Sequence, residues 1–525
     1  MAQVNRSDVV IVGGGHNGLV AAILLARAGV SVTLFEEKDE VGGAAKTEYP
    51  FAKAPNLGIS SGAYLLGLAP PELLAELGLD LPLIRRDPHY FLPTTGDRFL
   101  LFGSDRAAMQ EQFLRFFSEA DWRANAAMND ELGALRDDLA TSWLLEPLPL
   151  EETAERFVRP ALRRHFVDLC RGSAKDYLER FAFRSDLLKA MYAVTDAFSG
   201  LDGGYETLGS GFNLLVHNMC RLPSSGGTWM IVQGGMGTVT GKLQELARAA
   251  GVRIEKSAPV LRIEIRGQTA HGVALADGRT FAAEVVLSNA DPFRTQHLVG
   301  KENLPEEYLA RLRAMERNGT TFKVNLCLSA LPRFRCLPED RGQYGPTIHL
   351  LPDEDVVIAE LARGYADAKA GRLPEFPSIE WYVHSAVDPT LSDTEGRHNA
   401  ALFVEWVPYE LAEASWDERE ESYVKHLLSI CDRFAPGTSD LVVDVFALHP
   451  RKIEQHFGIT RGHIHHVDNT IGFTDRHPYA YPINGLYSCS AGCHPAGSVI
   501  GAAGHNAAKR ILRDLGMRRA ATPLI

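Results

Sequence analysis

The sequence has few cysteines and no long apolar segment. Only seven cysteines occur in 525 residues, and none precedes Cys170. An odd, dispersed set of this kind is typical of reduced thiols and argues against a disulfide-stabilised secreted domain. No uninterrupted apolar run reaches the roughly 18 residues of a transmembrane helix. The first residues, MAQVNRSD, lead directly into a strand-like segment, so no signal peptide is visible and the sequence predicts a cytoplasmic protein.

The chain also lacks a concentration of positive charge. Its 54 Lys and Arg against 66 Asp and Glu give a net charge of −12. Nucleic acid is therefore not expected as a partner, because its binding needs a basic stripe or patch. One segment mixes basic and apolar residues, FVRPALRRHFVDLCR at 157–171. It is typical of a solvated helix, and peripheral contact with a membrane surface is the alternative.

A glycine-rich turn stands near the N-terminus. The apolar, β-branched run at 9–12 predicts a buried strand, and it is followed by Gly13-x-Gly15-x-x-Gly18 and a helical pattern. Such glycines allow a tight turn, a close approach of the backbone to a pyrophosphate, and close packing of helix on strand. A second strand is predicted at 30–35. The unit is therefore typical of a dinucleotide-binding fold, with phosphates at the helix N-terminus.

Two features beyond this unit narrow the choice of nucleotide. Glu36 ends the second predicted strand, where a carboxylate accepts hydrogen bonds from a ribose 2′-OH and repels a 2′-phosphate. NADP is therefore disfavoured. The glycine pair Gly42-Gly43 follows, and a further strand, glycine-rich turn and helix are predicted at 484–512.

Stretches spread over nearly the whole chain resemble the phytoene desaturase and amine oxidase superfamily of FAD enzymes. The nearest branch is the phytoene-dehydrogenase-related one that includes the pyridine nucleotide-disulphide oxidoreductase domain-containing proteins. The matching stretches are VVIVGGGHNGLVAA, FEEKDEVGGAAKTE, GGTWMIVQGGMGTVTGKLQELARAAGV, VLRIEI, GVALADGRTFAAEVVLSNADP, FKVNLCLSALPRF, GITRGHIHH and GLYSCSAGCHPAGSVIGAAGHNAA. Flavin disulphide reductases are a poor match, because they carry a redox cysteine pair soon after the first nucleotide motif.

The resemblance implies an α/β fold, that of a two-dinucleotide-binding-domain flavoprotein. Its Rossmann-like FAD domain is assembled from discontinuous segments, expected at 1–75, 226–298 and 470–525. An α+β substrate domain is expected at 76–225 and 299–469. The aromatic residues of the first of these segments suit an apolar pocket, although most are expected to be core.

The resemblance also implies which residues contact FAD. It places the backbone of Val260 against the adenine and the C-terminal turn under the flavin. The expected cofactor-binding residues are Gly13, Gly15, His16, Asn17, Gly18, Glu36, Glu37, Gly42, Gly43, Ala44, Val260, Asn289, Ala290, Gly492, His494, Val499 and Gly501. Covalent attachment of FAD through Cys493 or His494 is an open alternative.

Lys323 is the first candidate for a catalytic role. It lies in TTFKVNLCLSALPRF, a strand-like segment, although lysine is depleted in strands. In amine-oxidase relatives a lysine in this context holds a water against flavin N5, which assists the reaction with oxygen. A strand-edge lysine that reaches solvent is the alternative.

His466 is the second candidate. It completes the superfamily pattern Gly458-x-x-x-Gly462-x-x-x-His466, and a histidine facing the substrate could act as a base. A packing or hydrogen-bonding role is the alternative. In an extended segment the side chains of His463 and His465 would lie on one face and that of His466 on the other. No cysteine or pair of carboxylates nearby completes a set of metal ligands. No metal is therefore expected at these histidines.

The resulting hypothesis is an FAD-dependent oxidoreductase that takes a hydride from a largely apolar small molecule and desaturates a C–C bond. Oxygen or a quinone would reoxidise the flavin. The alternatives are amine (C–N) oxidation, a redox-neutral FAD isomerase, and a binding protein that FAD only stabilises. A pair of aromatic rings with a carboxylate in the pocket would favour an amine.

Overall fold

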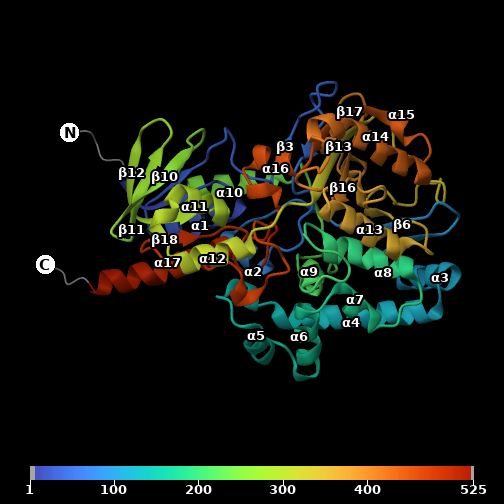
Figure 1. Ribbon diagram of the computed structural model, residues 1–525, viewed down its shortest axis with the longest axis horizontal. Coiled ribbons are helices and arrows are strands. Elements are labelled where there is room, and N and C mark those ends of the chain that lie inside the picture. Colours follow the sequence, from blue (N-terminus) through green and yellow to red (C-terminus); the bar gives the residue numbers. More distant parts are fainter. Residues whose placement is uncertain (1–5, 522–525) are drawn as a thin grey trace.

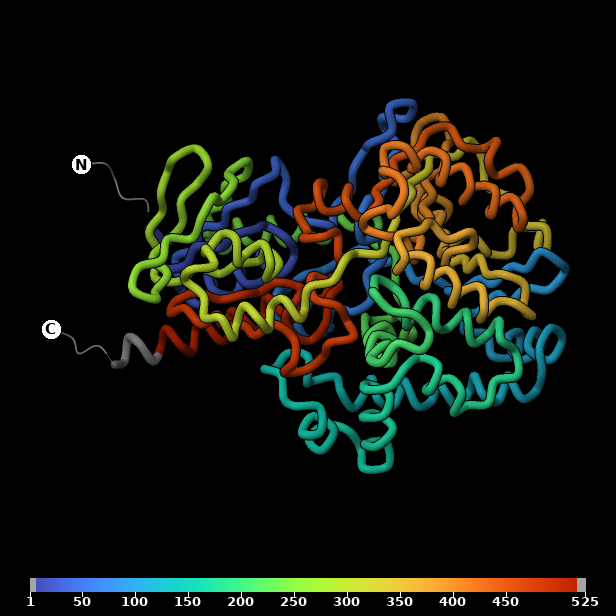
Figure 2. Tube along the Cα trace, viewed as in Figure 1, coloured from blue at the N-terminus to red at the C-terminus, as the bar shows by residue number. Residues whose placement is uncertain are grey.

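Two seven-stranded sheets lie side by side, with a helical layer against the second (Figure 1). They are seen in a computed structural model that describes residues 6–521, of which 517–521 are described by their backbone alone. Helices α1 and α17 lie beside the first sheet, and several separate segments of the chain pass between the two lobes (Figure 1 and Figure 2).

The first sheet is largely parallel. Its strand order is β10–β11–β12–β1–β2–β9, with β18 paired to the C-terminal part of β12. The strands are β1 (Arg6–Val12), β2 (Val32–Phe35), β9 (Arg253–Glu255), β10 (Val260–Arg266), β11 (Thr269–Leu275), β12 (Thr280–Ser288) and β18 (Leu486–Ser488). The antiparallel hairpin β11–β12 turns at Asp277-Gly278, as predicted from this dipeptide.

Helix α1 (His16–Arg27) crosses the first sheet and packs between α10 (Gly237–Ala249) and α17 (Ala502–Ala521). Gly18 allows helix α1 to approach the glycine-rich turn closely, because a Cβ at Gly18 would lie 2.4 Å from the Gly13 carbonyl oxygen. The packing role predicted for this glycine is therefore confirmed. The second strand is shorter than predicted, beginning at Val32 rather than Val30.

The second sheet has two chemically different faces. Its order is β17–β13–β16–β15–β14–β6–β7. The strands are β6 (Tyr90–Pro93), β7 (Phe99–Phe102), β13 (Thr321–Leu328), β14 (Thr347–Leu350), β15 (Ser378–Tyr382), β16 (His398–Glu405) and β17 (Val442–Leu448). One face is apolar and packs with α14 (Trp416–Phe434) in a single core cluster. The opposite face carries buried polar side chains and looks toward the first sheet.

The segment 76–225 is mostly helical beyond β7, as predicted, and runs from α3 (Arg106–Phe116) to α9 (Ser210–His217). Within 157–171 the apolar residues Phe166 and Leu169 are buried in the core, while Arg164 faces solvent. Contact of this segment with a membrane remains a prediction. Among the described residues, no helix combines the length and apolar composition needed to cross a membrane.

One buried guanidinium joins two chain segments next to the sheets. Arg476 is 1 % exposed. Its side chain donates to the carbonyls of Val467, Asp468 and Ile471 at 2.8–3.2 Å and to those of Ala491 and Cys493 at 3.1 Å. Burial lowers its pKa to about 10, so the group stays charged at neutral pH.

Replacing Arg476 tests this arrangement. Arg476→Lys should lower the free energy of unfolding by about 2–4 kcal/mol, because one ammonium cannot reach both segments and buried carbonyls lose their donors. Chemical unfolding followed by circular dichroism measures the change. The exposed Arg164→Lys is the control and should shift stability by less than about 0.5 kcal/mol. Equal effects of the two substitutions would contradict the role of Arg476.

Candidate active site

A long cavity begins at the glycine-rich turn and ends on the polar face of the second sheet. Its lining includes Gly13, Gly15 and Val12 at one end and Lys323 and Glu380 at the other. It therefore joins the predicted nucleotide-binding unit to the predicted substrate domain.

The nucleotide end is suited to a phosphate. Helix α1 begins after Gly15 with no side-chain cap and no acidic residue in its first turn, so its free N–H groups and partial positive charge face the cavity. A Cβ at Gly15 would lie 2.8 Å from the Asn289 amide nitrogen, and Gly43 has φ +59°. His16 adds a buried Nε2 with no hydrogen-bond partner in the described chain, and burial lowers its pKa to about 4. The ring is therefore neutral, and its Nε2 is a hydrogen-bonding atom on the cavity lining whose role as donor or acceptor depends on the tautomer.

Glu36 is held at the end of β2 with its carboxylate in this part of the cavity. Its Oε2 accepts from the Gly14 N–H at 2.7 Å and its Oε1 from the Lys38 N–H at 2.9 Å. Burial raises its pKa, and the two N–H donors oppose that shift. A carboxylate has about four lone-pair sites, so acceptor capacity remains for ribose hydroxyls.

Most of the residues predicted to contact FAD line this one cavity. They are Gly13, Gly15, His16, Asn17, Glu36, Glu37, Gly42, Gly43, Ala44, Val260, Asn289, Ala290 and Val499, together with the catalytic candidates Lys323 and His466. Four lie behind the lining: Gly18, Gly492, His494 and Gly501. The His494 ring faces the Ser142 carbonyl at 3.4 Å, and Gly492 donates its N–H to the Ser490 hydroxyl.

The three histidines at 463–466 lie on a turn, whereas the prediction of two faces assumed an extended segment. His466 has φ +61°, and its N–H bonds to the His463 carbonyl at 2.9 Å. The expected division into two faces was therefore wrong. His466 Nδ1 lies 3.0 Å from the Ser490 hydroxyl, and His465 Nε2 lies 2.9 Å from the Ser199 carbonyl. Both rings line the cavity.

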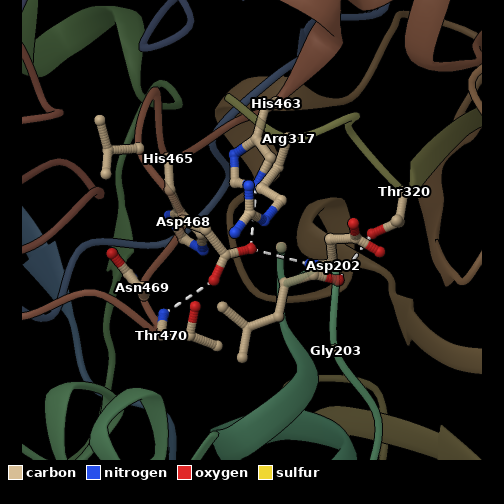
Figure 3. A network of polar contacts seen from close by, with 12 residues as sticks. Asp202, Gly203, Arg317, Thr320, His463, His465, Asp468, Asn469 and Thr470 are labelled. Atoms are coloured by element: carbon tan, nitrogen blue, oxygen red, sulfur yellow. Dashed lines mark hydrogen bonds and ion pairs between the residues drawn. The ribbon is translucent and has the colours of Figure 1, made fainter. Parts of the chain in front are cut away.

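His463 points away from this cavity into a buried polar network. Its Nε2 lies 3.0 Å from Asp468, which also accepts the N–H groups of Asp202 and Thr470 (Figure 3). This bond to His463 lowers the pKa of Asp468 although burial opposes it. The pair orders the turn that carries His465 and His466. Within residues 6–521, no three His, Cys, Asp or Glu side chains are grouped so as to hold a metal ion.

Strand register places Lys323 and Glu380 in one row across the second sheet. Phe403 of β16 is opposite Lys323 of β13 on one side and opposite Glu380 of β15 on the other. Directly paired residues point to the same face, so all three side chains look into the cavity. Lys323 is 3 % exposed, which excludes the alternative of a lysine that reaches solvent.

One polar atom on each of Lys323 and Glu380 has no hydrogen-bond partner among the described residues. Lys323 Nζ lies 3.4 Å from the centre of the Tyr64 ring, but it donates no hydrogen bond to any described residue. Glu380 Oε2 accepts from the Tyr382 hydroxyl, whereas its Oε1 has no partner in the described structure. Thr195 also hydrogen-bonds toward this carboxylate, which opposes the rise in the Glu380 pKa, and its hydroxyl lies 2.9 Å from His349 Nε2.

Burial shifts the pKa of both groups toward neutral forms. It lowers the pKa of Lys323 well below its ordinary value and raises that of Glu380, and the charge of each group opposes the shift of the other. Arg86 adds a second buried cation on the lining, which donates to the Thr347 hydroxyl at 2.9 Å. Tyr90, also on the lining, lies 3.1 Å from Asp196, whose pKa burial raises to about 7.

Sequence reasoning missed Glu380, Tyr382, Arg86 and Tyr64. For the first two a signal exists: in SIEWY, polar Ser378, Glu380 and Tyr382 alternate with Ile379 and Trp381, and every residue is buried. A buried strand with one polar face indicates a cavity or a second polar layer on that side. Nothing local marks Arg86 or Tyr64.

The chain matches the family model described as flavin containing amine oxidoreductase over residues 18–349. It belongs to this family. A relative from Mus musculus, pyridine nucleotide-disulfide oxidoreductase domain-containing protein 2, is 32 % identical, covering 97 % of this chain and 94 % of the relative. Hydroxyneurosporene desaturase of Cereibacter sphaeroides is 30 % identical over 54 % of this chain and 56 % of its own.

Among solved structures, putrescine oxidase bound to putrescine is similar in fold, with a TM-score of 0.59 and 17 % identity. The match covers 98 % of this chain and 99 % of that one. The predicted α/β flavoprotein fold, FAD as cofactor and an oxidoreductase activity are thereby confirmed at the level of the family. The uncapped helix, the Glu36 carboxylate and the unpartnered His16 nitrogen fit FAD in the cavity.

Removing the Glu36 carboxylate tests the nucleotide end. Glu36→Ala should weaken FAD binding by about 5- to 150-fold, because it removes hydrogen bonds to the ribose that are typically worth about 1–3 kcal/mol in total. Binding is measured by quenching of flavin fluorescence during titration of the apoprotein. Glu40→Ala is the matched control, since Glu40 also lines the cavity but pairs with Lys256 at the surface. Equal affinities for wild type and Glu36→Ala would remove Glu36 from the site.

Proposed function

We propose that this flavoprotein dehydrogenates a C–C bond of a small organic molecule with a largely apolar body, and that oxygen or a quinone is the final electron acceptor. The observation that carries the proposal is the continuity of the cavity from the nucleotide end to the Lys323–Glu380 row. Bound FAD supplies the hydride acceptor. The similarity to a desaturase supports C–C bond chemistry.

The chain's own residues have distinct tasks in this proposal. Aromatic and apolar side chains give the substrate a mostly dry chamber, which orients its C–H bond and keeps water from the reacting carbon; they are Leu65, Trp229, Phe403 and Ile464. Tyr90 can pass a proton from the chamber to Asp196, whose pKa of about 7 suits an acceptor near neutral pH. His466 is the other candidate for this task.

Oxidation of an amine is the second candidate. The Glu380 carboxylate has an unpartnered oxygen on the lining, and the rings of Tyr64 and Tyr382 lie beside it with centroids 4.3 Å apart. A carboxylate next to two aromatic rings suits a cationic or amino group. The fold shared with putrescine oxidase is compatible with this chemistry.

Replacing Lys323 tests whether the row of Lys323, Phe403 and Glu380 takes part in reoxidation of the flavin. Lys323→Met should slow the reaction of the reduced protein with oxygen by about tenfold or more, because it removes a buried hydrogen-bond donor that would stabilise the negative charge developing on oxygen. Stopped-flow absorbance after anaerobic photoreduction gives the rate. Flavin content should equal that of wild type, which separates this effect from lost cofactor. An unchanged rate would remove Lys323 from the reaction.

The first test of the proposed function is the absorption spectrum of the flavin bound to the purified protein. The purified protein should show a flavin spectrum that passes to the supernatant on acid precipitation, because the Cys493 thiol and His494 lie behind the cavity lining. After anaerobic photoreduction, oxygen or a soluble quinone should restore the oxidised spectrum. Persistence of reduced flavin with both acceptors would contradict an oxidoreductase that uses them.

The type of bond is tested by anaerobic mixing with alkenes and amines of matched size. Bleaching of the flavin by an alkene, with a product that has lost two hydrogen atoms, supports C–C dehydrogenation. Bleaching by amines alone, with an imine or aldehyde as product, would replace it by the second candidate.

A further inference from the structure

One buried cation of the substrate chamber has no carboxylate within ion-pair distance among the described residues. Arg86 is 3 % exposed and lines the cavity. The neighbouring Arg85, by contrast, is partly exposed and pairs with Asp87. A buried charge is ordinarily paired, because taking it out of water is costly. A guanidinium does not avoid that cost by losing its proton in a protein, so Arg86 needs an anion that the chain does not supply.

Part of this guanidinium remains free for a ligand. Its Nε donates to the Trp229 carbonyl at 2.8 Å and its Nη1 to the Thr347 hydroxyl at 2.9 Å, whereas its Nη2 donates to no described residue. Two separate segments of the chain therefore hold the side chain in place. A guanidinium fixed in this way binds a carboxylate with little further loss of side-chain entropy.

The charges around Arg86 favour a singly charged anion. Two cations line the chamber, Arg86 and Lys323, against one carboxylate, Glu380. Burial lowers the pKa of Arg86, and Glu380 opposes this less than the hydroxyls of Tyr382 and Tyr90 do, so Glu380 is a weak counter-ion for it. A carboxylate ligand would make the two signs equal in number. An ammonium would add a third cation, and a phosphate, with a charge of about −1.5 to −2, would exceed the single charge that is missing.

The order of strands in the second sheet favours an elongated ligand. Thr347, which accepts from Arg86, lies on β14, and Lys323 lies on β13. Strands β15 and β16 separate them, so three spacings of about 4.8 Å put β14 and β13 about 14 Å apart. Tyr382 of β15 and Phe403 of β16 line the cavity over this interval. A hydrocarbon chain along these rings would connect a carboxylate at Arg86 with the Lys323 end.

We propose that Arg86 binds the carboxylate of the substrate, which is an elongated acid whose hydrocarbon chain extends along the second sheet toward Lys323. This rests on the proposed function, since the chamber is taken as the substrate site. Arg86 is thereby a specificity-determining residue: it selects an acid over an amine or a plain hydrocarbon, and it fixes which carbon of the chain lies at the Lys323 end.

Four probes with one chain length test the head group on the FAD-loaded protein: octanoate, octanamide, octylamine and octyl phosphate. Binding is followed by perturbation of the visible flavin spectrum and independently by calorimetry. Octanoate should bind about tenfold or more tightly than each of the others, as expected for charge-assisted hydrogen bonds in a buried site. A preference for another probe, equal binding of octanoate and octanamide, or no binding of octanoate would overturn the proposal.

Butyrate tests the length of the ligand. It carries the same head group, but its short chain covers little of the apolar wall, so it should bind at least about tenfold more weakly than octanoate. Equal affinities of butyrate and octanoate would overturn the elongated substrate.

Replacing the two neighbouring arginines identifies the residue that binds the head group. Arg86→Met should lose most of the preference for octanoate over octanamide, whereas Arg85→Met at the surface pair should keep it. Survival of the preference in Arg86→Met would overturn the proposal. Should Arg86→Met fail to fold, Arg86→Lys decides: it keeps the charge without the planar fork, so octanoate should bind about threefold or more weakly while octanamide binds as before. An unchanged affinity for octanoate in Arg86→Lys would then overturn the proposal.

Failure of the carboxylate site is distinguishable from failure of the proposed function. A protein that binds and cycles FAD but does not prefer octanoate refutes the carboxylate site alone. A protein without redox-active flavin refutes the proposed function.

Discussion

The arrangement of the site depends on a single buried guanidinium. Arg476 Nη1 donates to the carbonyls of Asp468 and Ile471, Nε donates to that of Cys493, and Nη2 donates to those of both Val467 and Ala491. The segment 467–471 follows the histidine turn directly, and the segment 491–493 is part of the C-terminal glycine-rich turn. Because both segments are irregular, neither could satisfy its buried carbonyls internally. The arginine provides the donors and thereby fixes His466 beside Ser490.

The second sheet meets a different constraint, because both of its faces are buried. The apolar face of β13, β15 and β16 packs on α14 and contributes a large hydrophobic cluster. The other face is free to carry Lys323, Glu380 and Tyr382, whose positions follow from strand register. Groups placed in this way are more precisely held than groups on loops, because each side chain is fixed by two neighbouring strands. The cost is a pair of polar atoms left without partners in the chain, which is tolerable where a ligand completes them.

The sequence allowed the nucleotide end to be predicted in detail, because its determinants are local. The turn from Gly13 to Gly18, the helix after it and Glu36 lie within about thirty residues, and each has a separate physical reason. The substrate end could not be predicted in this way. Lys323 and Glu380 come together through pairing of β13 with β16 and of β16 with β15, and no spacing in the sequence encodes that register.

One further difference between prediction and structure has a local cause. The division of the histidines at 463–466 into two faces assumes an extended segment, but a positive φ at His466 and the Asp468 network fold them into a turn. Gly492, His494 and Gly501, which the resemblance places against the cofactor, pack and hydrogen-bond with neighbouring chain segments behind the cavity lining, and their contact with FAD stays a prediction. A glycine-rich motif marks where the backbone comes close to something, and the neighbour can be a second chain segment as well as a ligand.

The charged side chains at the nucleotide end of the cavity are held differently from those at the substrate end. At the nucleotide end Glu36 is held by two backbone N–H groups and Glu37 is paired with Arg294. At the other end Lys323 and Glu380 balance each other only through space. The carboxylates of the nucleotide end are thus held by neighbouring groups of the chain, whereas the opposite charges of Lys323 and Glu380 have only each other as a nearby counter-charge in the row.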